Sequence, residues 1–354
     1  MARQQVECWR YNIFDKMKKK QVILSFDYEL FFGDQSGTVV NTLIRPTNQL
    51  LDIMEDCGFR GNFFVDWQML KYLKGATTKR TDEDLELIIN QLKDIVRRGH
   101  RIELHIHPHW VDAKYNGDGT WDFSEFRHYS LNSFNEDEII QMFKEGTQLL
   151  NSIAREIVPN YKICAFRAGG WAVQPFDKLK KAFIESGIII DSSTSIGCYN
   201  FYSDSYYDFR KMPDKSLFHF ENDVCVEDVK GKFIEVPITS FHRNLLLVLI
   251  DRIYGSKFHY FDKMTDGTHS RKSSNCSNQH KKSFIDKIKG NHKLMFSFSM
   301  QSPITIKCAL STYRHLDICC YIDHPKDFSK ATEKGIRVLK NRCESVNYIQ
   351  LCDK

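Results

Sequence analysis

Three histidines lie close together in the segment Arg101-Ile102-Glu103-Leu104-His105-Ile106-His107-Pro108-His109-Trp110. Its first five residues predict a short β-strand. They follow an amphipathic helix expected over residues 82–98, which Gly99 ends. This helix and the strand after it are one unit of an alternation that continues in both directions along the chain. Alternation of this kind is typical of a parallel sheet, either open or closed into a barrel.

The alternation of strands and helices covers most of the chain. Buried strands are expected at residues 22–26, 61–65, 101–105, 163–166, 188–190 and 318–322, and residues 346–349 close the core. Helices are expected at residues 46–57, 82–98, 135–157, 176–186 and 329–340. Asn135 and Glu138 fit a capping box at the start of the helix over 135–157. The sequence therefore predicts an α/β fold.

Two regions depart from the alternation. Residues 1–20 are expected to form an N-terminal extension ahead of a catalytic domain over residues 21–354. From about residue 198 to residue 292 we expect an insertion. Its first part is rich in Tyr and Phe and predicts a β-rich arm. Residues 262–292 are rich in Ser, Asn and Lys and predict a flexible loop.

The composition argues against several classes of protein. The 354 residues carry a formal net charge of +5 at pH 7, and the basic residues are spread out, so no nucleic-acid surface is expected. No apolar run approaches the ~18 residues that a membrane span needs. The first twenty residues lack the apolar segment of a secretory signal. The eleven cysteines have no regular spacing and indicate reduced thiols. These features predict a cytoplasmic protein.

Polar clusters follow five of the predicted strands. They are Asp27-Tyr28-Glu29, His105-Ile106-His107-Pro108-His109, Arg167-Ala168-Gly169-Gly170-Trp171, Asp191-Ser192-Ser193-Thr194 and Tyr321-Ile322-Asp323-His324-Pro325. In α/β sheets and barrels, active sites form at the carboxyl ends of the strands. We therefore expect the five clusters to contribute to one site.

The histidine run indicates a metal ion. Three histidines within five residues are rare, and imidazole is the commonest protein ligand of Zn²⁺ and related ions. His105 and His107 share a face if the chain stays extended, whereas His105 and His109 converge if Pro108 turns the chain. The alternative is a surface cluster of histidines. Because the run directly follows a buried strand, we interpret it as a metal site.

The acidic cluster and the Arg167 cluster offer groups for catalysis and for substrate. Asp27 and Glu29 leave their strand on one face, so they can divide between binding a metal and taking a proton. Arg167 at a buried strand end needs a carboxylate. The two glycines at 169–170 let the backbone approach a ligand closely. Trp171 suits stacking against a sugar ring.

The last two clusters are weaker signals. The segment that begins at Asp191 also fits the cap of a helix or turn. His324 is a lone histidine, and a lone histidine is more often structural. Its position after an apolar strand, at the same end of the sheet as the other clusters, favours a functional role.

Taken together and in this order, the clusters resemble the NodB-type polysaccharide deacetylases, which form carbohydrate esterase family 4. The resemblance runs from about Val22 onward and is most specific in the His-x-x-x-His spacing of His105 and His109. It implies a distorted (β/α) barrel, often of seven strands, that binds Zn²⁺ or a similar divalent ion. It also implies that His105 and His109 are the two metal-binding histidines.

The resemblance implies a role for four further residues. Asp27 matches the catalytic base of the family, and Arg167 matches the residue that orients this base. Asp191 matches an acid that supports the acid side of the site. His324 matches the late histidine that acts as general acid.

The chain departs from the family pattern at two places. Tyr28 stands where the family usually has a second Asp, so we expect Glu29 to be the metal-binding acid. Gly169, Gly170 and Trp171 stand near the usual Pro and Tyr, which leaves the backbone donor to the oxyanion open. His107 is additional, and it would replace His109 as a ligand or contact substrate.

The expected function is the metal-dependent removal of N-acetyl groups from an amino sugar. The expected substrate is an oligosaccharide, nucleotide-sugar or lipid-linked precursor of a surface polysaccharide, because no export signal is expected. Two alternatives stay open. One is a deformylase or cyclic-amide hydrolase with the same fold and metal, and the other is a carbohydrate-binding protein that has lost catalysis. The oligomeric state is not predicted.

Overall fold

The computed structural model describes residues 19–201, 205–268 and 293–353. Its main sheet has nine strands and follows the order β10-β11-β7-β6-β3-β2-β1-β14, with β15 paired to β1. The strands are β1 (Lys20–Tyr28), β2 (Gly61–Asp66), β3 (Arg101–Ile106), β6 (Ala165–Ala168), β7 (Ile190–Asp191), β10 (Phe218–Phe220), β11 (Phe233–Glu235), β14 (Ile318–Asp323) and β15 (Cys343–Ser345). Of the eight strands on the main path, only β10 is antiparallel to its neighbour, so seven run parallel.

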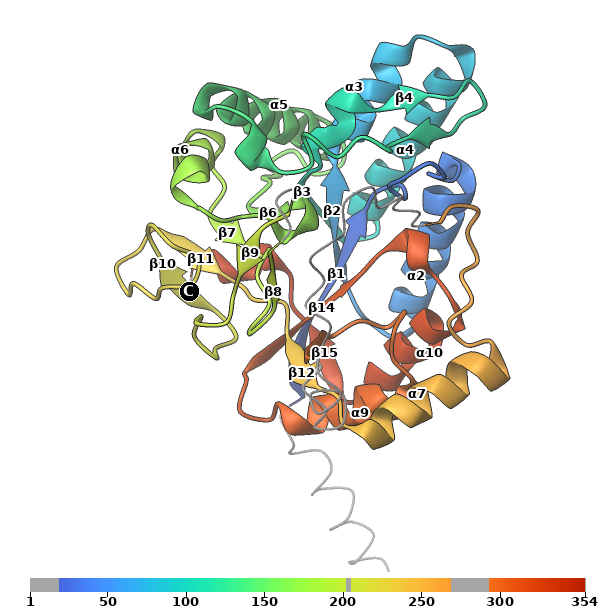
Figure 1. The fold of residues 1–354 in the computed structure, drawn as a ribbon, viewed down its shortest axis with the longest axis vertical. Helices are drawn as coiled ribbons and strands as arrows, with labels where there is room; N and C mark the ends of the chain where they lie inside the picture. Colours follow the sequence, from blue (N-terminus) through green and yellow to red (C-terminus); the bar gives the residue numbers. More distant parts are fainter. Residues whose placement is uncertain (1–18, 202–204, 269–292, 354) are drawn as a thin grey trace, which may run out of the picture.

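The parallel sheet curls into a half-barrel (Figure 1). After β11, the backbone N–H of Thr239 donates to the carbonyl of Cys320 in β14 at 3.0 Å. The N–H of Cys320 donates in return to Oγ1 of Thr239 at 2.9 Å. These bonds connect the segment after β11 to β14, and the curled sheet of seven parallel strands with outer helices confirms the predicted distorted (β/α) barrel.

The helices cover the outside of this barrel (Figure 1). They are α2 (Arg45–Asp56), α3 (Trp67–Ala76), α4 (Lys79–Arg97), α5 (Glu136–Arg155), α6 (Asp177–Ser186), α7 (Leu245–Phe258), α9 (Pro303–Thr312) and α10 (Lys330–Leu339). Capping residues mark where helices begin. For example, Asn135 and Glu138 form the predicted capping box of α5. Ile88, Leu92 and Ile95 of α4 are fully buried, because their spacing places them on one helix face.

Short elements complete the chain. The two-stranded pairs are β4 (Lys114–Tyr115) with β5 (Trp121–Asp122), β8 (Tyr199–Asn200) with β9 (Tyr207–Asp208), and β12 (Ser240–His242) with β13 (Lys293–Met295). The short helical turns are η1 (Val40–Ile44), η2 (Pro108–Asp112), η3 (Leu131–Ser133), η4 (Gly169–Trp171), η5 (Pro325–Asp327) and η6 (Tyr348–Leu351). Several of these turns follow barrel strands and therefore lie where the site forms.

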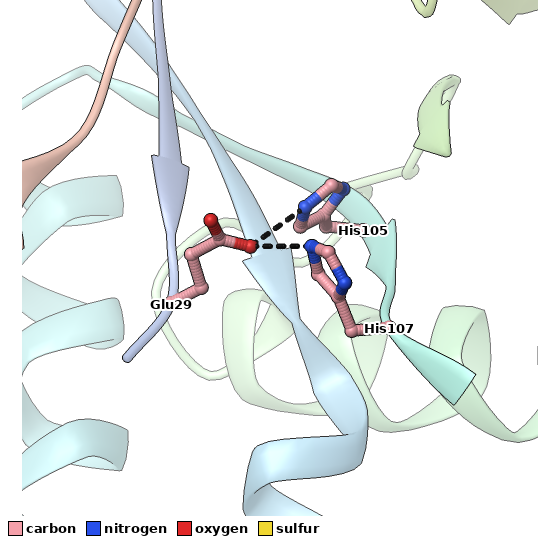
Figure 2. Close-up of side chains that lie close together, drawn as sticks. All are labelled: Glu29, His105 and His107. Carbon is pink, nitrogen blue, oxygen red and sulfur yellow. Dashed lines mark hydrogen bonds and ion pairs between the residues drawn. The ribbon is translucent and has the colours of Figure 1, made fainter. Parts of the chain in front are cut away.

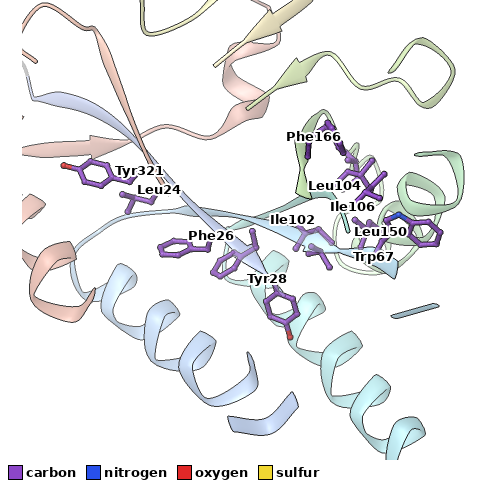
Figure 3. Close-up of a cluster of buried hydrophobic side chains, with 14 of the residues drawn as sticks. Leu24, Phe26, Tyr28, Trp67, Ile102, Leu104, Ile106, Leu150, Phe166 and Tyr321 are labelled. Carbon is purple, nitrogen blue, oxygen red and sulfur yellow. The ribbon is translucent and has the colours of Figure 1, made fainter. Parts of the chain in front are cut away.

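Successive side chains of a strand point to opposite faces of the sheet, so the strands contribute to two separate apolar clusters. Leu24, Phe26 and Tyr28 of β1 point out of the barrel toward the helices (Figure 3). Full burial of one such side chain stabilises the fold by about 1.5–3 kcal/mol. Ile23 of β1 belongs instead to a second cluster inside the barrel, together with Tyr348 from η6. The turn η6 thus fills the barrel interior from one end.

The region predicted as an inserted arm is divided by the structure. β10 and β11 belong to the main sheet, whereas the β8–β9 pair and the β12–β13 pair form separate two-stranded sheets. Residues 262–268 pack on the barrel, since Oγ1 of Thr265 donates to the carbonyl of Lys326 at 2.8 Å. Residues 269–292 of the predicted loop and residues 1–18 of the predicted extension lie outside the described residues. Among the residues described, no helix is long and apolar enough to cross a membrane.

Candidate metal centre and active site

The carboxyl ends of β1 and β3 bring one acid and two histidines together (Figure 2). Oε2 of Glu29 lies 3.0 Å from Nε2 of His105 and 2.7 Å from Nε2 of His107. One ligand atom from each of the three residues lies within 4.8 Å of the others, and all three side chains are buried. One carboxylate oxygen and two imidazole nitrogens therefore converge on one point.

The hydrogen bond on the far side of His105 shows that a cation fits this point. Nδ1 of His105 lies 2.7 Å from the backbone carbonyl of Arg167, which can only accept, so Nδ1 carries a proton. A neutral His105 then turns the lone pair of Nε2 toward the carboxylate of Glu29, which is repulsive. A proton or a metal ion between the two atoms removes this repulsion, and a backbone carbonyl that accepts from Nδ1 is a usual partner of a metal-binding histidine.

Charge and burial set the protonation of the same residues. Burial alone would raise the pKa of Glu29, but the charges of Lys326 and His107 and the imidazole hydrogen bonds lower it well below its ordinary value. Burial lowers the pKa of His107 to about 4. Burial also opposes the charged form of His105, but Asp27 and Glu29 raise its pKa. Glu29 is thus ionised and His107 neutral, as metal ligands must be.

His109 does not join this cluster, contrary to the expected His105–His109 pair. β3 ends at Ile106 and His107 keeps an extended backbone, so His105 and His107 share a face. Pro108 then starts η2, and the ring of His109 lies 5.2 Å from that of His107 between centroids, outside the convergent group of three. The ring of His109 lies among aromatic rings, 4.5 Å from Phe32 and 5.1 Å from Tyr129 between centroids.

Asp27 and Arg167 form an ion pair inside the barrel. Nη1 of Arg167 lies 2.6 Å from Oδ1 of Asp27, and neither side chain is more than 5% exposed. Arg167 also donates from Nε to the carbonyl of Ser192 at 2.8 Å and from Nη2 to Oγ of Ser25 at 2.9 Å. The guanidinium is held at both ends, so it fixes the orientation of Asp27.

His324 approaches the two acids from β14. Its Nε2 lies 3.7 Å from Oδ2 of Asp27 and 3.6 Å from Oε1 of Glu29, while its Nδ1 lies 3.3 Å from Oδ2 of Asp327. Burial would lower the pKa of His324, but the hydrogen bond and charge of Asp327 and the charge of Asp27 raise it. The side chain is 22% exposed, so this imidazole borders both the acids and solvent.

Three residues near the site were missed by sequence reasoning. Lys326 is 1% exposed, and its Nζ lies 2.6 Å from Oε1 of Glu29 and 3.0 Å from the carbonyl of Leu30. Asp327 is the acid beside His324. Both lie in η5, directly after the predicted His324 cluster, but no spacing rule marks them.

The third missed residue, Asp66, had a signal. It directly follows the predicted strand over residues 61–65, and the strand-end rule that selected Asp27 also applies to it. Its Oδ2 accepts from Nε1 of Trp110 at 2.6 Å, and its Oδ1 accepts from the N–H of His107 at 3.3 Å. Burial raises the pKa of Asp66 to about 7. Asp66 thus anchors the turn that carries His107.

Asp191 lies on the other face of the sheet from these residues, contrary to the role expected for it. Its neighbour Ser192 contacts Arg167 inside the barrel, so alternation points Asp191 outward. There it pairs across the strands with Glu235, and Oγ of Ser193 donates to it at 2.7 Å. The acid beside His324 is Asp327 instead.

The turn η4 packs its backbone against the histidines. A Cβ atom at Gly169 would lie 2.6 Å from Nδ1 of His107, and a Cβ atom at Gly170 would lie 2.5 Å from the ring of Tyr129. Gly170 also has a φ of 59°. Only glycine fits at both positions, so the chain passes directly beside the site. Trp171 follows and meets Tyr207 edge-on at 6.0 Å between ring centroids.

The chain is similar in fold to solved structures of low sequence identity, whereas no family profile and no curated protein matches it. A protein described as a polysaccharide deacetylase from Mycobacterium smegmatis is 15% identical, with a TM-score of 0.47 over 96% of this chain and 91% of that chain. Puue allantoinase is 10% identical, with a TM-score of 0.48 over 94% and 89% of the two chains. A 4-alpha-glucanotransferase from Thermococcus litoralis is 12% identical, with a TM-score of 0.48 over 96% of this chain and 41% of that chain.

These three names state three different activities, so the likeness concerns the fold, and the activity has to come from the site. In fold, the chain is similar to polysaccharide deacetylases, the family that its strand-end motifs resemble.

Proposed function

We propose that this chain is a metal-dependent hydrolase that removes N-acetyl groups from amino sugars. The observation that carries the proposal is the convergence of His105 and His107 on one oxygen of Glu29, beside the Asp27–Arg167 pair. Glu29, His105 and His107 would hold a divalent ion, with Zn²⁺ the best match for one carboxylate and two imidazoles. When bound, such an ion supplies a Lewis acid that polarises an amide carbonyl and lowers the pKa of a water molecule toward ~7.

Asp27 is the proposed general base. Arg167 occupies its Oδ1 at 2.6 Å, so Oδ2 is the oxygen that takes a proton from the attacking water. The fixed guanidinium keeps this carboxylate oriented. Arg167 is therefore a positioning residue in this mechanism.

His324 is the proposed general acid. Asp327 holds its Nδ1 and raises its pKa, so the imidazole carries a proton that Nε2 can pass to the departing amine. This Nε2 lies 3.7 Å from Oδ2 of Asp27, so the proposed acid and the proposed base are direct neighbours. Cleavage of the amide C–N bond then gives acetate and a free amino sugar.

The turn at residues 169–171 is the proposed contact to the carbonyl oxygen and to the sugar. Its backbone lies beside His107, so an N–H donor there can stabilise charge on the oxygen in the transition state. Trp171 offers an aromatic face for the sugar. None of the nine described cysteines forms a disulfide, and thiols of this kind are typical of a reducing compartment. We therefore infer a cytoplasmic substrate, such as an N-acetylated nucleotide-sugar, an oligosaccharide or a lipid-linked sugar.

Release of acetate from a panel of N-acetylated sugars and sugar nucleotides tests the proposal, with Zn²⁺ supplied in excess. We expect Asp27→Asn and His105→Ala to abolish release. Asp52→Asn is the matched control, because Asp52 is a surface carboxylate that is 71% exposed. Release of formate in place of acetate would identify the protein as a deformylase. If the protein binds no stoichiometric metal and the Asp27→Asn variant still binds sugar like the parent, the protein is a carbohydrate-binding protein without catalysis.

A further inference from the structure

A second surface of distinct composition lies at the opposite end of the barrel from the candidate metal centre. The metal centre forms at the carboxyl ends of the strands, whereas α7 and α9 pack against each other in the lower part of Figure 1, near the amino ends of β1 and β14. This end contributes nothing to the chemistry proposed above. Its surface therefore needs an explanation of its own.

Helix α7 exposes an apolar face. Leu246 is 65% exposed, and four more large apolar side chains of the helix are about half exposed: Leu245, Leu249, Ile253 and Phe258. Leu247 and Asp251 face the protein and are buried. Positions 245, 249 and 253 are four residues apart and so form one stripe along the helix. Single exposed leucines are common, but a stripe of this length marks a contact surface.

The charges on these two helices have one sign. Arg252 and Lys257 of α7 and Lys307 of α9 are exposed. The acid of α7, Asp251, is buried and accepts from the start of α9 and from Arg243. The sequence of α9 has no acid. The exposed charges within these two helices are all cations, so the apolar stripe of α7 matches a surface that is both apolar and anionic, as a membrane interface with anionic lipids is.

A cavity beside α9 adds further cations. Its volume is about 640 Å³, and its charged lining residues are Lys19, Lys20, Lys307, Arg314, Arg342 and Asp317. Five of these six are basic. Among the described residues, no ion pair within 4.0 Å joins any of the five to a carboxylate, and Nζ of Lys20 donates to the backbone carbonyl of Tyr313 at 2.9 Å. The cavity therefore has a net positive lining that an anion would complement.

We propose that this end of the molecule binds an anionic lipid surface. The apolar stripe of α7 enters the boundary between headgroups and acyl chains, and the cationic cavity takes a lipid phosphate. A second copy of the chain is a poorer occupant, because a two-fold contact would bring the same cationic surfaces together. A nucleic acid would match the cations but leave the leucine stripe exposed. The inference does not depend on the deacetylation chemistry.

Binding to vesicles tests this inference on the full chain. We expect co-sedimentation with phosphatidylglycerol-containing vesicles and little with vesicles of phosphatidylcholine alone. Leu246→Glu with Leu249→Glu should lower vesicle affinity about tenfold or more, because the inserted apolar side chains are lost. Lys307→Glu with Arg314→Glu should lower it by a similar factor and reduce its dependence on salt. Val229→Glu is the matched control, since Val229 is 80% exposed and lies outside α7 and α9.

Three outcomes would overturn the inference. One is equal binding of parent and both double variants. Another is a dimer that Leu246→Glu dissociates, which would assign the stripe to a second copy. The third is binding of inorganic phosphate in the cavity without any vesicle binding. Thermal unfolding and acetate release from a water-soluble sugar should be unchanged in all variants, so a failure here is separate from a failure of the proposed hydrolase.

Discussion

Nζ of Lys326 lies 2.6 Å from Oε1 of Glu29, while Oε2 of the same carboxylate faces two imidazoles. The lysine therefore fixes which oxygen is turned toward the metal centre. It also neutralises Glu29 in the protein without metal, where the buried carboxylate would otherwise rely on the histidines alone.

Replacement of Lys326 by Met should make folding depend more strongly on metal. The change leaves Glu29 buried without its cation, so we expect the metal-free protein to lose about 3 kcal/mol of unfolding free energy. Zn²⁺ should restore more of this stability in the variant than it adds to the parent. Thermal unfolding with a chelator and with Zn²⁺ measures both effects. Lys71→Met, which removes an exposed lysine paired with Glu145, is the control and should change little in either condition. Equal metal responses in Lys326→Met and the parent would contradict the role given to this lysine.

His107 and His109 should differ sharply as metal ligands. Nε2 of His107 faces Glu29, so His107→Ala removes a ligand and should weaken Zn²⁺ binding by more than about 100-fold. His109→Ala removes a ring from an aromatic cluster and should mainly lower stability. Competition with a chromophoric chelator gives both affinities. If His109→Ala weakens binding and His107→Ala does not, the metal centre is the His105–His109 pair that the sequence resemblance implies.

The Asp27–Arg167 pair should be strongly coupled in stability. Arg167→Met leaves a buried carboxylate without its cation, and we expect a loss of about 3–5 kcal/mol in unfolding free energy. Adding Asp27→Leu should recover part of this loss, because no unpaired charge remains. Urea denaturation of the two single variants and the double variant measures the coupling. Losses that simply add would show that the two side chains act independently.

Glu235 should make the protein less stable as the pH rises. Burial and the neighbouring Asp191 raise the pKa of Glu235 well above its ordinary value. The folded state then keeps a proton that the unfolded chain releases, so stability falls from about pH 5 toward the raised pKa. Each pKa unit of the shift costs about 1.4 kcal/mol.

Glu235→Gln should flatten this decline, since an amide does not ionise. Urea denaturation between about pH 5 and about pH 8 compares the variant with the parent. Glu83→Gln, at a position 57% exposed, is the control and should keep the slope of the parent. A parent whose stability is constant over this range would refute the prediction.

The barrel was predictable because its signals are local. Each predicted strand at residues 22–26, 61–65 and 101–105 is an apolar run that ends in polar residues, and the structure contains all three. The choice between His107 and His109 was not predictable, because it depends on the residue at which the strand ends. The role of Asp191 failed for a related reason: the motif places it at a strand end, but only the register of β7 decides which face it takes. Lys326 reaches Glu29 across 297 residues, a contact that no local pattern marks.

The interior turn η6 affects how the site assembles during folding. Oη of Tyr348 lies 2.8 Å from Oγ of Ser192 and 3.4 Å from Nη2 of Arg167, beneath the Asp27 pair. β14, which completes the barrel and carries His324, also comes late in the chain. The Asp27–Arg167 pair therefore becomes enclosed only after β14 and Tyr348, which is 181 residues from Arg167, have packed against the earlier strands, so completion of the site depends on contacts of long sequence separation.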